Sequence, residues 1–131
     1  MAVHDCPFCR LDKHRIRLES EFAVAVHDGF PITEGHTLVI PTRHVASLFE
    51  LSEEEQTAVW KFVAKVRAKL AADFRPDGFN IGLNDGISAG QTVMHAHVHV
   101  IPRRDGDVAD PRGGVRWVLP DKARYWEEAR K

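Results

Sequence analysis

Short runs of apolar residues, several alternating with polar ones, predict several β-strands. Four of these runs are five or six residues long and are separated by Gly, Pro or charged residues, namely 16–20, 22–27, 36–40 and 79–83. Such runs are typical of strands, and the break between the first two is short enough for a hairpin. Polar and apolar residues alternate again within residues 90–103. The chain therefore predicts a sheet of five strands.

One long helix is predicted to begin at Ser52. The sequence Ser52-Glu53-Glu54-Glu55 is a capping box, in which a hydroxyl precedes a carboxylate by three residues. Apolar residues then recur at helical spacing, at Val59, Phe62, Val63, Val66 and Leu70. The sequence Arg75-Pro76-Asp77-Gly78 ends the helix. Because the apolar residues share one face, we expect the helix to pack on the sheet. The preceding stretch, 45–51, is predicted to be a turn of helix or a loop.

Three histidines alternate with apolar residues in the fifth run: His95, His97 and His99. A strand places all three imidazoles on one face, whereas a helix spreads positions i, i+2 and i+4 over about 200°. One histidine on a strand is ordinarily part of its polar face. Three in alternation indicate a functional site.

The length of 131 residues, the 44% hydrophobic content and the net charge of -1 predict one domain spanning residues 1–131. Because there is no broad basic field, we expect no extended nucleic-acid binding. No apolar run approaches the roughly 20 residues that span a bilayer, and the amino terminus lacks the features of a secretory signal. We therefore expect a cytoplasmic protein without a membrane partner.

The two cysteines form the motif Cys6-Pro7-Phe8-Cys9. This spacing occurs in zinc sites and in dithiol oxidoreductases. A redox dithiol of that type lies between a first strand and a long helix, whereas here five residues precede Cys6 and the charged segment 10–17 follows Cys9. The context favours a zinc element within residues 1–15 with two further ligands from elsewhere. A redox pair and a pair without metal stay open as alternatives.

The polar segment 84–92 directly precedes the histidine run. Its glycines let the backbone approach a ligand and turn amides toward an anion, but such turns also merely reverse a chain. Next to three aligned histidines, the segment is predicted to be a ligand loop. Asp28 follows the run 22–27, where its carboxylate can cap the turn or bind a ligand hydroxyl.

Strand geometry divides the three histidines. Alternate residues lie about 6.6 Å apart and the two end residues about 13 Å apart, so all three cannot bind one metal ion without a sharp bend. We expect one end histidine to join Cys6 and Cys9, which leaves the other two for catalysis. A neutral imidazole whose other nitrogen donates to a backbone carbonyl can attack phosphorus, while its neighbour stabilises the phosphoryl oxygens.

The histidine-triad (HIT) family has the signature His-φ-His-φ-His-φ-φ, with φ apolar, and this chain resembles it at Gly90-Gln91-Thr92-Val93-Met94-His95-Ala96-His97-Val98-His99-Val100-Ile101. The resemblance extends from Cys6 to about Arg103. The run 85–103 is most similar to the fragile-histidine-triad branch, the dinucleoside polyphosphate hydrolases, whereas the Cys-x-x-Cys motif is similar to zinc-bearing bacterial-type members. The resemblance implies a hydrolase that attacks the α-phosphate of a dinucleoside polyphosphate or nucleoside phosphoramidate and forms a nucleotidyl-histidine.

The resemblance also implies roles for individual residues. The implied catalytic positions are His97 as nucleophile, His99 at the phosphate oxygens, Gln91 near the scissile bond and His36 as a hydrogen-bonding support for the triad. The implied substrate contacts are Asp28 and Gly29 at the ribose, Asn84 at the nucleotide, and Gly90, Gln91 and Thr92 at the phosphates, together with His97 and His99. The implied ligands of a structural zinc ion are Cys6, Cys9, His44 and His95.

The fold that the resemblance implies is α+β, with a five-stranded antiparallel sheet, one long helix and one short helix, assembled as a two-fold homodimer. Three alternatives stay open for the activity: a metallohydrolase whose histidine-bound metal activates water, a nucleotidyltransferase or phosphorylase, and a nucleotide-binding regulatory protein. The tail 104–131 has no implied role. Two of the three tryptophans lie within 115–126, which we expect to dock on the body or on a second subunit.

Overall fold

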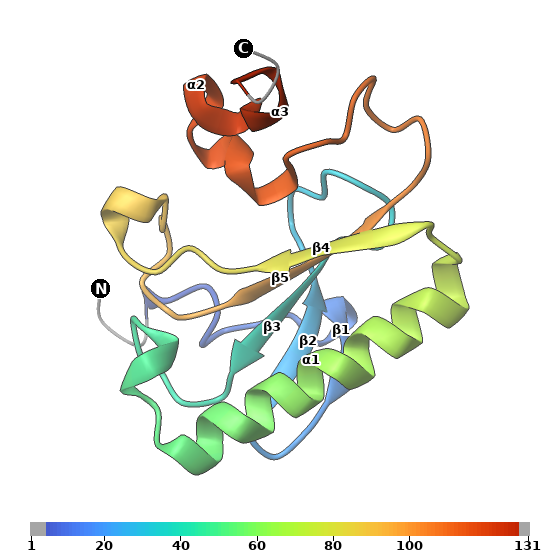
Figure 1. Ribbon diagram of the computed structural model, residues 1–131. Helices are drawn as coiled ribbons and strands as arrows, with labels where there is room; N and C mark the ends of the chain where they lie inside the picture. Colours follow the sequence, from blue (N-terminus) through green and yellow to red (C-terminus); the bar gives the residue numbers. More distant parts are fainter. Residues whose placement is uncertain (1–4, 129–131) are drawn as a thin grey trace.

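A five-stranded antiparallel sheet forms the centre of the structure, a computed structural model that describes residues 5–128 (Figure 1). The strand order is β1-β2-β3-β5-β4. The strands are β1 (Ile16–Glu19), β2 (Ala23–His27), β3 (Thr37–Pro41), β4 (Gly78–Gly82) and β5 (Val98–Arg103). The first four begin and end within one residue of the predicted runs, so the predicted sheet is confirmed.

The helix α1 (Glu53–Phe74) crosses one face of the sheet, as Figure 1 shows. Both hydrogen bonds of the predicted capping box are present: the Ser52 hydroxyl accepts from the Glu55 amide, and the Glu55 carboxylate accepts from the Ser52 amide. The predicted apolar stripe is buried and packs with Val98 and Val100 of β5 in the main core. Within the described residues, no helix is both long enough and apolar enough to cross a bilayer.

The other face of the sheet is covered in part by the amino-terminal segment. Phe8 and Leu11 of this segment pack on a smaller core formed by Val26, Leu38 and Ile40. The segment continues through the short 3₁₀ helix η2 (Lys13–Arg15) into β1. Its packing leaves the part of this face around β5 available for a site.

The residues of β5 alternate between the two faces of the sheet. Val98, Val100 and Pro102 are buried, whereas the intervening residues His99, Ile101 and Arg103 are half-buried. The buried set faces the core under α1, because Val98 and Val100 belong to that core. The half-buried set therefore forms a row on the opposite face.

The histidine stretch differs from the prediction. Residues 93–95 form a bend and β5 begins only at Val98, so the first two histidines precede the strand. The prediction of one strand carrying all three histidines is therefore wrong. The physical cause is a tertiary hydrogen bond: the Ala96 amide donates to the Val45 carbonyl at 2.7 Å, which takes this segment out of the sheet ladder.

The connections that border the site are short 3₁₀ helices. The stretch 45–51 contains η3 (Leu48–Glu50), which agrees with the predicted turn of helix. The segment between β4 and β5 contains η4 (Ile87–Ala89) and closes at Gly90, whose φ of 100° favours glycine. The tight left-handed position at Gly90 brings the loop back toward the histidines.

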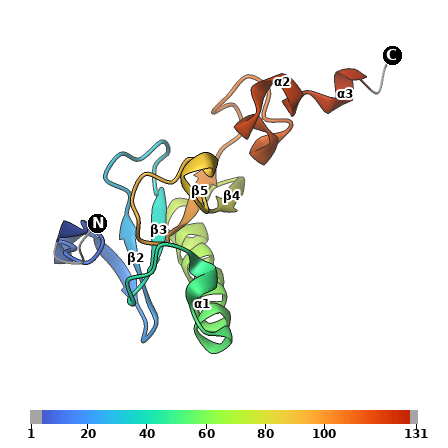
Figure 2. The ribbon, with the colours of Figure 1, turned by 90° about the vertical axis from the view of Figure 1, so that its left-hand side faces the viewer.

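The carboxyl-terminal tail lies beyond the edge strand β4 in both views (Figures 1 and 2). It contains η5 (Gly114–Val118) and two four-residue helices, α2 (Pro120–Ala123) and α3 (Tyr125–Glu128). These two short helices lie in the part of the chain for which the resemblance implied no role. Trp117 is fixed by a hydrogen bond from its Nε1 to the Arg112 carbonyl at 2.9 Å. The tail therefore has local structure of its own next to the sheet.

Candidate active site

A cavity of about 410 Å³ lies where the amino-terminal segment, the β2–β3 loop and the segment after β4 meet beside the histidines. Seven residues that the sequence assigned to the substrate line it: Asp28, Gly29, Asn84, Gly90, Thr92, His97 and His99. They come from residues 28–29 and from residues 84–99, which are more than 50 residues apart in sequence. The volume lies within the range of about 300–1,000 Å³ that is usual for small-molecule sites.

His97 is held in one tautomer by the backbone. Its Nδ1 lies 2.8 Å from the carbonyl oxygen of His95. Because a carbonyl can only accept, Nδ1 carries the proton, and in the neutral ring Nε2 has the lone pair. The His97 ring makes edge contacts with the rings of Phe8 and His99, with ring centroids 4.9 Å and 5.3 Å from its own. His97 therefore has the form required of a nucleophile.

His36 and His99 form a hydrogen-bonded relay. The Ile32 amide donates to His36 Nδ1 at 3.2 Å, so the proton of a neutral His36 is on Nε2. His36 Nε2 lies 2.9 Å from His99 Nδ1, which must therefore accept. The proton of His99 is then on its own Nε2. His99 consequently has an N–H group that it can donate to a phosphoryl oxygen.

The environment keeps both relay histidines neutral. Burial lowers the pKa of His36, although the nearby Asp28 carboxylate opposes this. Burial, with the neighbouring His97 and His36 rings, lowers the pKa of His99 to about 4. Both rings are therefore uncharged near neutral pH, which is the state that the hydrogen-bond order requires.

Asp28 serves the turn and also faces the cavity. Its Oδ1 accepts from the Phe30 amide at 2.7 Å, which is the predicted turn cap. Its Oδ2 lies 3.3 Å from His36 Nε2 and 3.9 Å from His99 Nδ1. The two uses predicted for this carboxylate are therefore compatible.

Gln91 is turned away from the cavity. Its side chain is buried, and its Nε2 donates to the carbonyls of Ala46 and Val93 while its Oε1 accepts from the Gly86 amide. Among the described residues that line the cavity, its neighbours Gly90 and Thr92 are present and Gln91 is not. The amide thus holds the loop in place through three backbone groups, and its contact with the scissile bond stays a prediction.

A second cluster lies beside the cavity and contains Cys6, Cys9, His44 and His95. Two Sγ atoms and two Nδ1 atoms all lie within 4.8 Å of one another. His95 Nδ1 is 3.5 Å from each sulfur and 3.1 Å from His44 Nδ1, which is 3.2 Å from Cys9 Sγ. A tetrahedral ion with bonds of about 2.0–2.3 Å separates its ligand atoms by roughly 3.3–3.8 Å. The cluster therefore fits a tetrahedral metal ion.

The outer nitrogen of His95 supports metal binding. His95 Nε2 lies 2.8 Å from the Pro41 carbonyl, so it carries the proton and leaves the Nδ1 lone pair facing the two sulfurs. Burial lowers the pKa of His95, which favours the neutral ring that a metal needs. The bend at residues 93–95 is what turns His95 toward the cysteines.

Two residues on the cavity wall carried no recognisable sequence signal as substrate contacts. Of the described residues, Arg15 is the one lysine or arginine that lines the cavity, and its guanidinium donates twice to the His27 carbonyl, at 2.8 and 3.2 Å. Phe8 packs on both His95 and His97. Arg15 lies in a charged segment whose spacing does not distinguish it from its neighbours. Phe8 drew attention solely as a residue between two cysteines.

Comparison with known proteins gives these residues a family context. The HIT domain model matches residues 12–106. Protein hit of Bacillus subtilis (strain 168) is 36% identical over 106 residues, which cover 78% of this chain and 73% of that protein. The asymmetrical bis(5'-nucleosyl)-tetraphosphatase of Schizosaccharomyces pombe is 45% identical over 80 residues, which cover 61% of this chain and 44% of that protein.

A solved structure agrees with these relatives. The crystal structure of a zinc-bound histidine triad family protein from Mycobacterium smegmatis has a TM-score of 0.69 and 33% sequence identity, and the match covers 99% of this chain and 100% of that one. The domain match alone includes more than half of the residues. By its sequence and its fold, the chain belongs to the HIT family.

Proposed function

We propose that the protein is a nucleotide hydrolase that acts on the α-phosphate of a dinucleoside polyphosphate or nucleoside phosphoramidate. The observation that carries this proposal is the fixed tautomer of His97, whose Nδ1 is bound by the His95 carbonyl at 2.8 Å. His97 lines a cavity that is also lined by Gly90 and Thr92 of the segment between β4 and β5, whose backbone amides can bind a phosphate. A relative from S. pombe is named as a tetraphosphatase, which supports the substrate class.

The reaction has two displacement steps. In the first, His97 Nε2 attacks the α-phosphorus, an N–P bond forms, and the leaving group departs with the electron pair of its bond to phosphorus. The nitrogen of a phosphoramidate takes a proton from solvent as this bond breaks and so leaves as ammonia. His99 donates its Nε2–H to a phosphoryl oxygen and stabilises the charge that develops there. In the second, water attacks the same phosphorus and gives one proton to the solvent, the N–P bond breaks, and His97 Nε2 regains its lone pair.

The other residues of the cavity bind and orient the nucleotide in this proposal. Asp28 and Gly29 contact the ribose hydroxyls, and Asn84 contacts the nucleotide. Gly90 and Thr92 contact the phosphates, with the His36 relay positioning His99. Arg15 adds positive charge to the cavity wall, which favours a polyanionic substrate. Gln91 acts through the loop that it holds, because its amide is already bonded to three backbone groups.

We propose zinc for the cluster of Cys6, Cys9, His44 and His95, in a structural role. Two thiolates and two imidazoles are a usual zinc donor set, and four protein ligands leave no open position for water. The ion would cross-link the amino-terminal segment to the bend at residues 93–95 and so hold Phe8 against His97. This closed donor set favours the covalent mechanism over a metallohydrolase.

The cytoplasmic location and the homodimer are proposals of the same kind. The tail exposes Val118, Leu119 and Tyr125, at 77%, 65% and 55%. Apolar side chains exposed to this degree are suited to a subunit contact. Light scattering after size-exclusion chromatography measures the number of subunits, and a monomer would rule out the dimer.

The covalent intermediate is the test of the proposed function. After brief reaction with diadenosine tetraphosphate or adenosine phosphoramidate, acid quenching and intact-protein mass spectrometry should show one added adenylyl group. The adduct should be absent from His97→Ala. An active His97→Ala variant would overturn the proposal. Adding inorganic phosphate and identifying the products distinguishes a hydrolase from a phosphorylase.

A further inference from the structure

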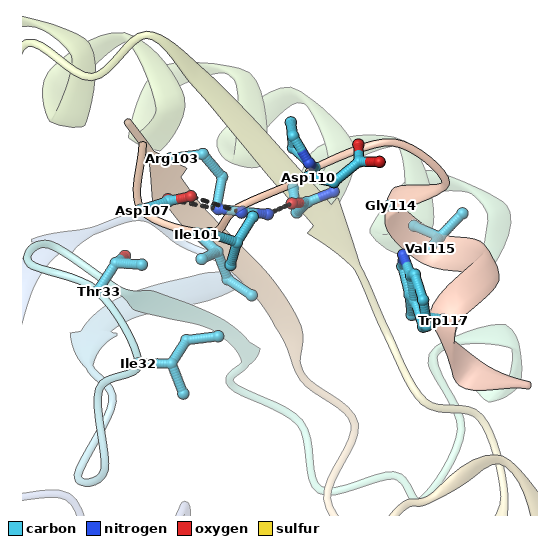
Figure 3. Close-up of a pocket in the computed structure, with 12 residues that line it drawn as sticks. Ile32, Thr33, Ile101, Arg103, Asp107, Asp110, Gly114, Val115 and Trp117 are labelled. Carbon is cyan, nitrogen blue, oxygen red and sulfur yellow. Dashed lines mark hydrogen bonds and ion pairs between the residues drawn. The ribbon is translucent and has the colours of Figure 1, made fainter. Parts of the chain in front are cut away.

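A second cavity lies between β5, the β2–β3 loop and the carboxyl-terminal tail. Figure 3 shows Ile101 and Arg103 on its floor, Ile32 and Thr33 on one side, and Val115 and Trp117 of η5 on the other. Its volume is about 590 Å³. A nucleoside is well within the size of ligand that such a volume accommodates. None of the catalytic steps described above uses this cavity.

The second cavity adjoins the catalytic cavity along two elements. On β5, His99 lines the first cavity and Ile101 the second, and successive residues on one face of a strand lie about 6.6 Å apart. The β2–β3 loop borders both, through Asp28 in the first and Ile32 in the second. A ligand whose α-phosphate lies at His97 and His99 can therefore extend into the second cavity along the β5 row.

The chemistry of the second cavity suits an aromatic base better than a phosphate. Arg103, its one lining cation among the described residues, is bound by both oxygens of Asp107 at 2.7 Å and by Asn80 at 2.6 Å. Its charge is therefore already neutralised. The Trp117 ring is 39% exposed and is anchored by its Nε1 hydrogen bond, so it offers a fixed aromatic surface. Ile32, Ile101 and Val115 supply apolar contacts.

We propose that this cavity binds the base of the leaving nucleotide, which stacks on Trp117. The inference rests on the proposed function and narrows it, because a dinucleoside polyphosphate has a second base and a simple phosphoramidate has none. The two cavities then form one elongated site, with the scissile bond beside His97 and the leaving polyphosphate crossing the β5 row. The tail acquires a role in substrate choice.

The test compares two substrates in variants of the full chain. We expect Trp117→Ala to lower kcat/KM for diadenosine tetraphosphate about tenfold, as loss of one base stack does. The kcat/KM for adenosine phosphoramidate should not change, because its leaving group is ammonia. Trp117→Phe keeps an aromatic face and should retain most of the kcat/KM for diadenosine tetraphosphate. Trp60→Ala on α1 removes a tryptophan of similar exposure, 40%, and should affect neither substrate.

A second variant blocks the cavity while Trp117 and its hydrogen bond stay in place. Val115 is 68% exposed, so Val115→Trp can be accommodated while its larger side chain fills the cavity. Val115→Trp should lower the ratio of kcat/KM for diadenosine tetraphosphate to kcat/KM for adenosine phosphoramidate. Equal losses for both substrates, an unchanged ratio, or a change in subunit number without a change in ratio would overturn the inference. If the wild type hydrolyses neither substrate and forms no adduct, the proposed function fails as well. Phosphoramidate turnover through a His97 adduct with an unchanged ratio would refute this inference alone.

Discussion

Two clusters of potential metal ligands, each containing one histidine of the triad, differ in the way that a histidine of each is hydrogen-bonded to the backbone. Cys6, Cys9, His44 and His95 form one, and Asp28, His36 and His99 form the other. In each, the candidate ligand atoms lie within 4.8 Å of one another. Spacing alone would make both of them metal sites.

The two clusters are distinguished by the ring nitrogen that points away from the cluster, which is Nε2 in His95 and Nδ1 in His36. His95 donates its outer N–H to the Pro41 carbonyl, so its inner nitrogen has a lone pair. His36 accepts the Ile32 amide on its outer nitrogen, so its inner nitrogen carries the proton. The first arrangement favours a metal ion, and the second favours a hydrogen bond to His99. The backbone partner of each imidazole therefore separates structure from catalysis.

The largest expected effect comes from His97, which lies between the two clusters. Because the proposed N–P bond forms on its Nε2, His97→Ala should lower kcat by at least about 10³-fold. The melting temperature of the His97→Ala variant should stay close to that of the wild type, since His97 belongs to neither cluster. Steady-state kinetics and calorimetry measure the two quantities. The exposed His14→Ala is the matched control, and comparable activity losses in both variants would contradict this assignment.

Metal removal should affect stability before catalysis. A chelator is expected to lower the melting temperature by on the order of 10 °C, because the proposed zinc ion would join the amino-terminal segment to the histidine bend. Below that transition, the chelated protein should keep its turnover. Cys9→Ser should reproduce the thermal shift and make it insensitive to chelator. Immediate loss of turnover in fully folded, chelated protein would show that the metal takes part in the chemistry.

Loss of the relay should have an intermediate effect on catalysis. His36→Ala leaves His99 Nδ1 without its donor, so the tautomer of His99 is no longer fixed, and kcat should fall about 10- to 100-fold. His36→Gln restores an N–H donor and should recover part of this loss. The pH profile of kcat should also move to higher pH in His36→Ala, because removing His36 raises the pKa of His99. A parallel loss in both variants without a pH shift would indicate general disruption.

The smallest effect is on the pH dependence of stability. The pKa of His99 falls from the usual 6.5 to about 4 in the folded protein, so the unfolded chain binds the proton more readily between these values. The free energy of unfolding therefore does not depend on this group above about pH 6.5, and it decreases as the pH falls from there to 4. The groups that face His99 are His97, His36 and Asp28, and the last opposes the shift. Denaturant titrations should show that His99→Asn loses about 1–2 kcal/mol less free energy of unfolding than the wild type over this pH range. The same pH dependence of stability in His99→Asn and the wild type would refute this role of His99.

The local features of the fold were predictable from the sequence. The capping box at Ser52 and the alternating runs specify a helix and strands through contacts that are close in sequence. The metal ligand set came from the family resemblance, and strand spacing agreed that one end histidine had to leave the catalytic group. These predictions depended on periodicity and motif spacing, which a single sequence displays.

Long-range contacts set the features that the sequence did not predict. The bend before β5 depends on the hydrogen bond between Ala96 and Val45, and the orientation of Gln91 depends on Ala46. Arg15 reaches the cavity because η2 leads it past the His27 carbonyl. The second cavity exists because the tail places Trp117 opposite Ile32. Each requires two parts of the chain to meet, so no local pattern encodes it.

The tautomers of the four imidazoles His36, His95, His97 and His99 show whether each ring serves the relay, the nucleophilic attack or the metal. Long-range ¹H–¹⁵N correlation spectra of the zinc-loaded, ¹⁵N-labelled protein report which nitrogen of each ring carries the proton. We expect Nδ1–H for His97, Nε2–H for His36 and His99, and metal-bound Nδ1 with Nε2–H for His95. An Nδ1 proton on His36, or an Nε2 proton on His97, would contradict the division of these histidines between relay, nucleophile and metal.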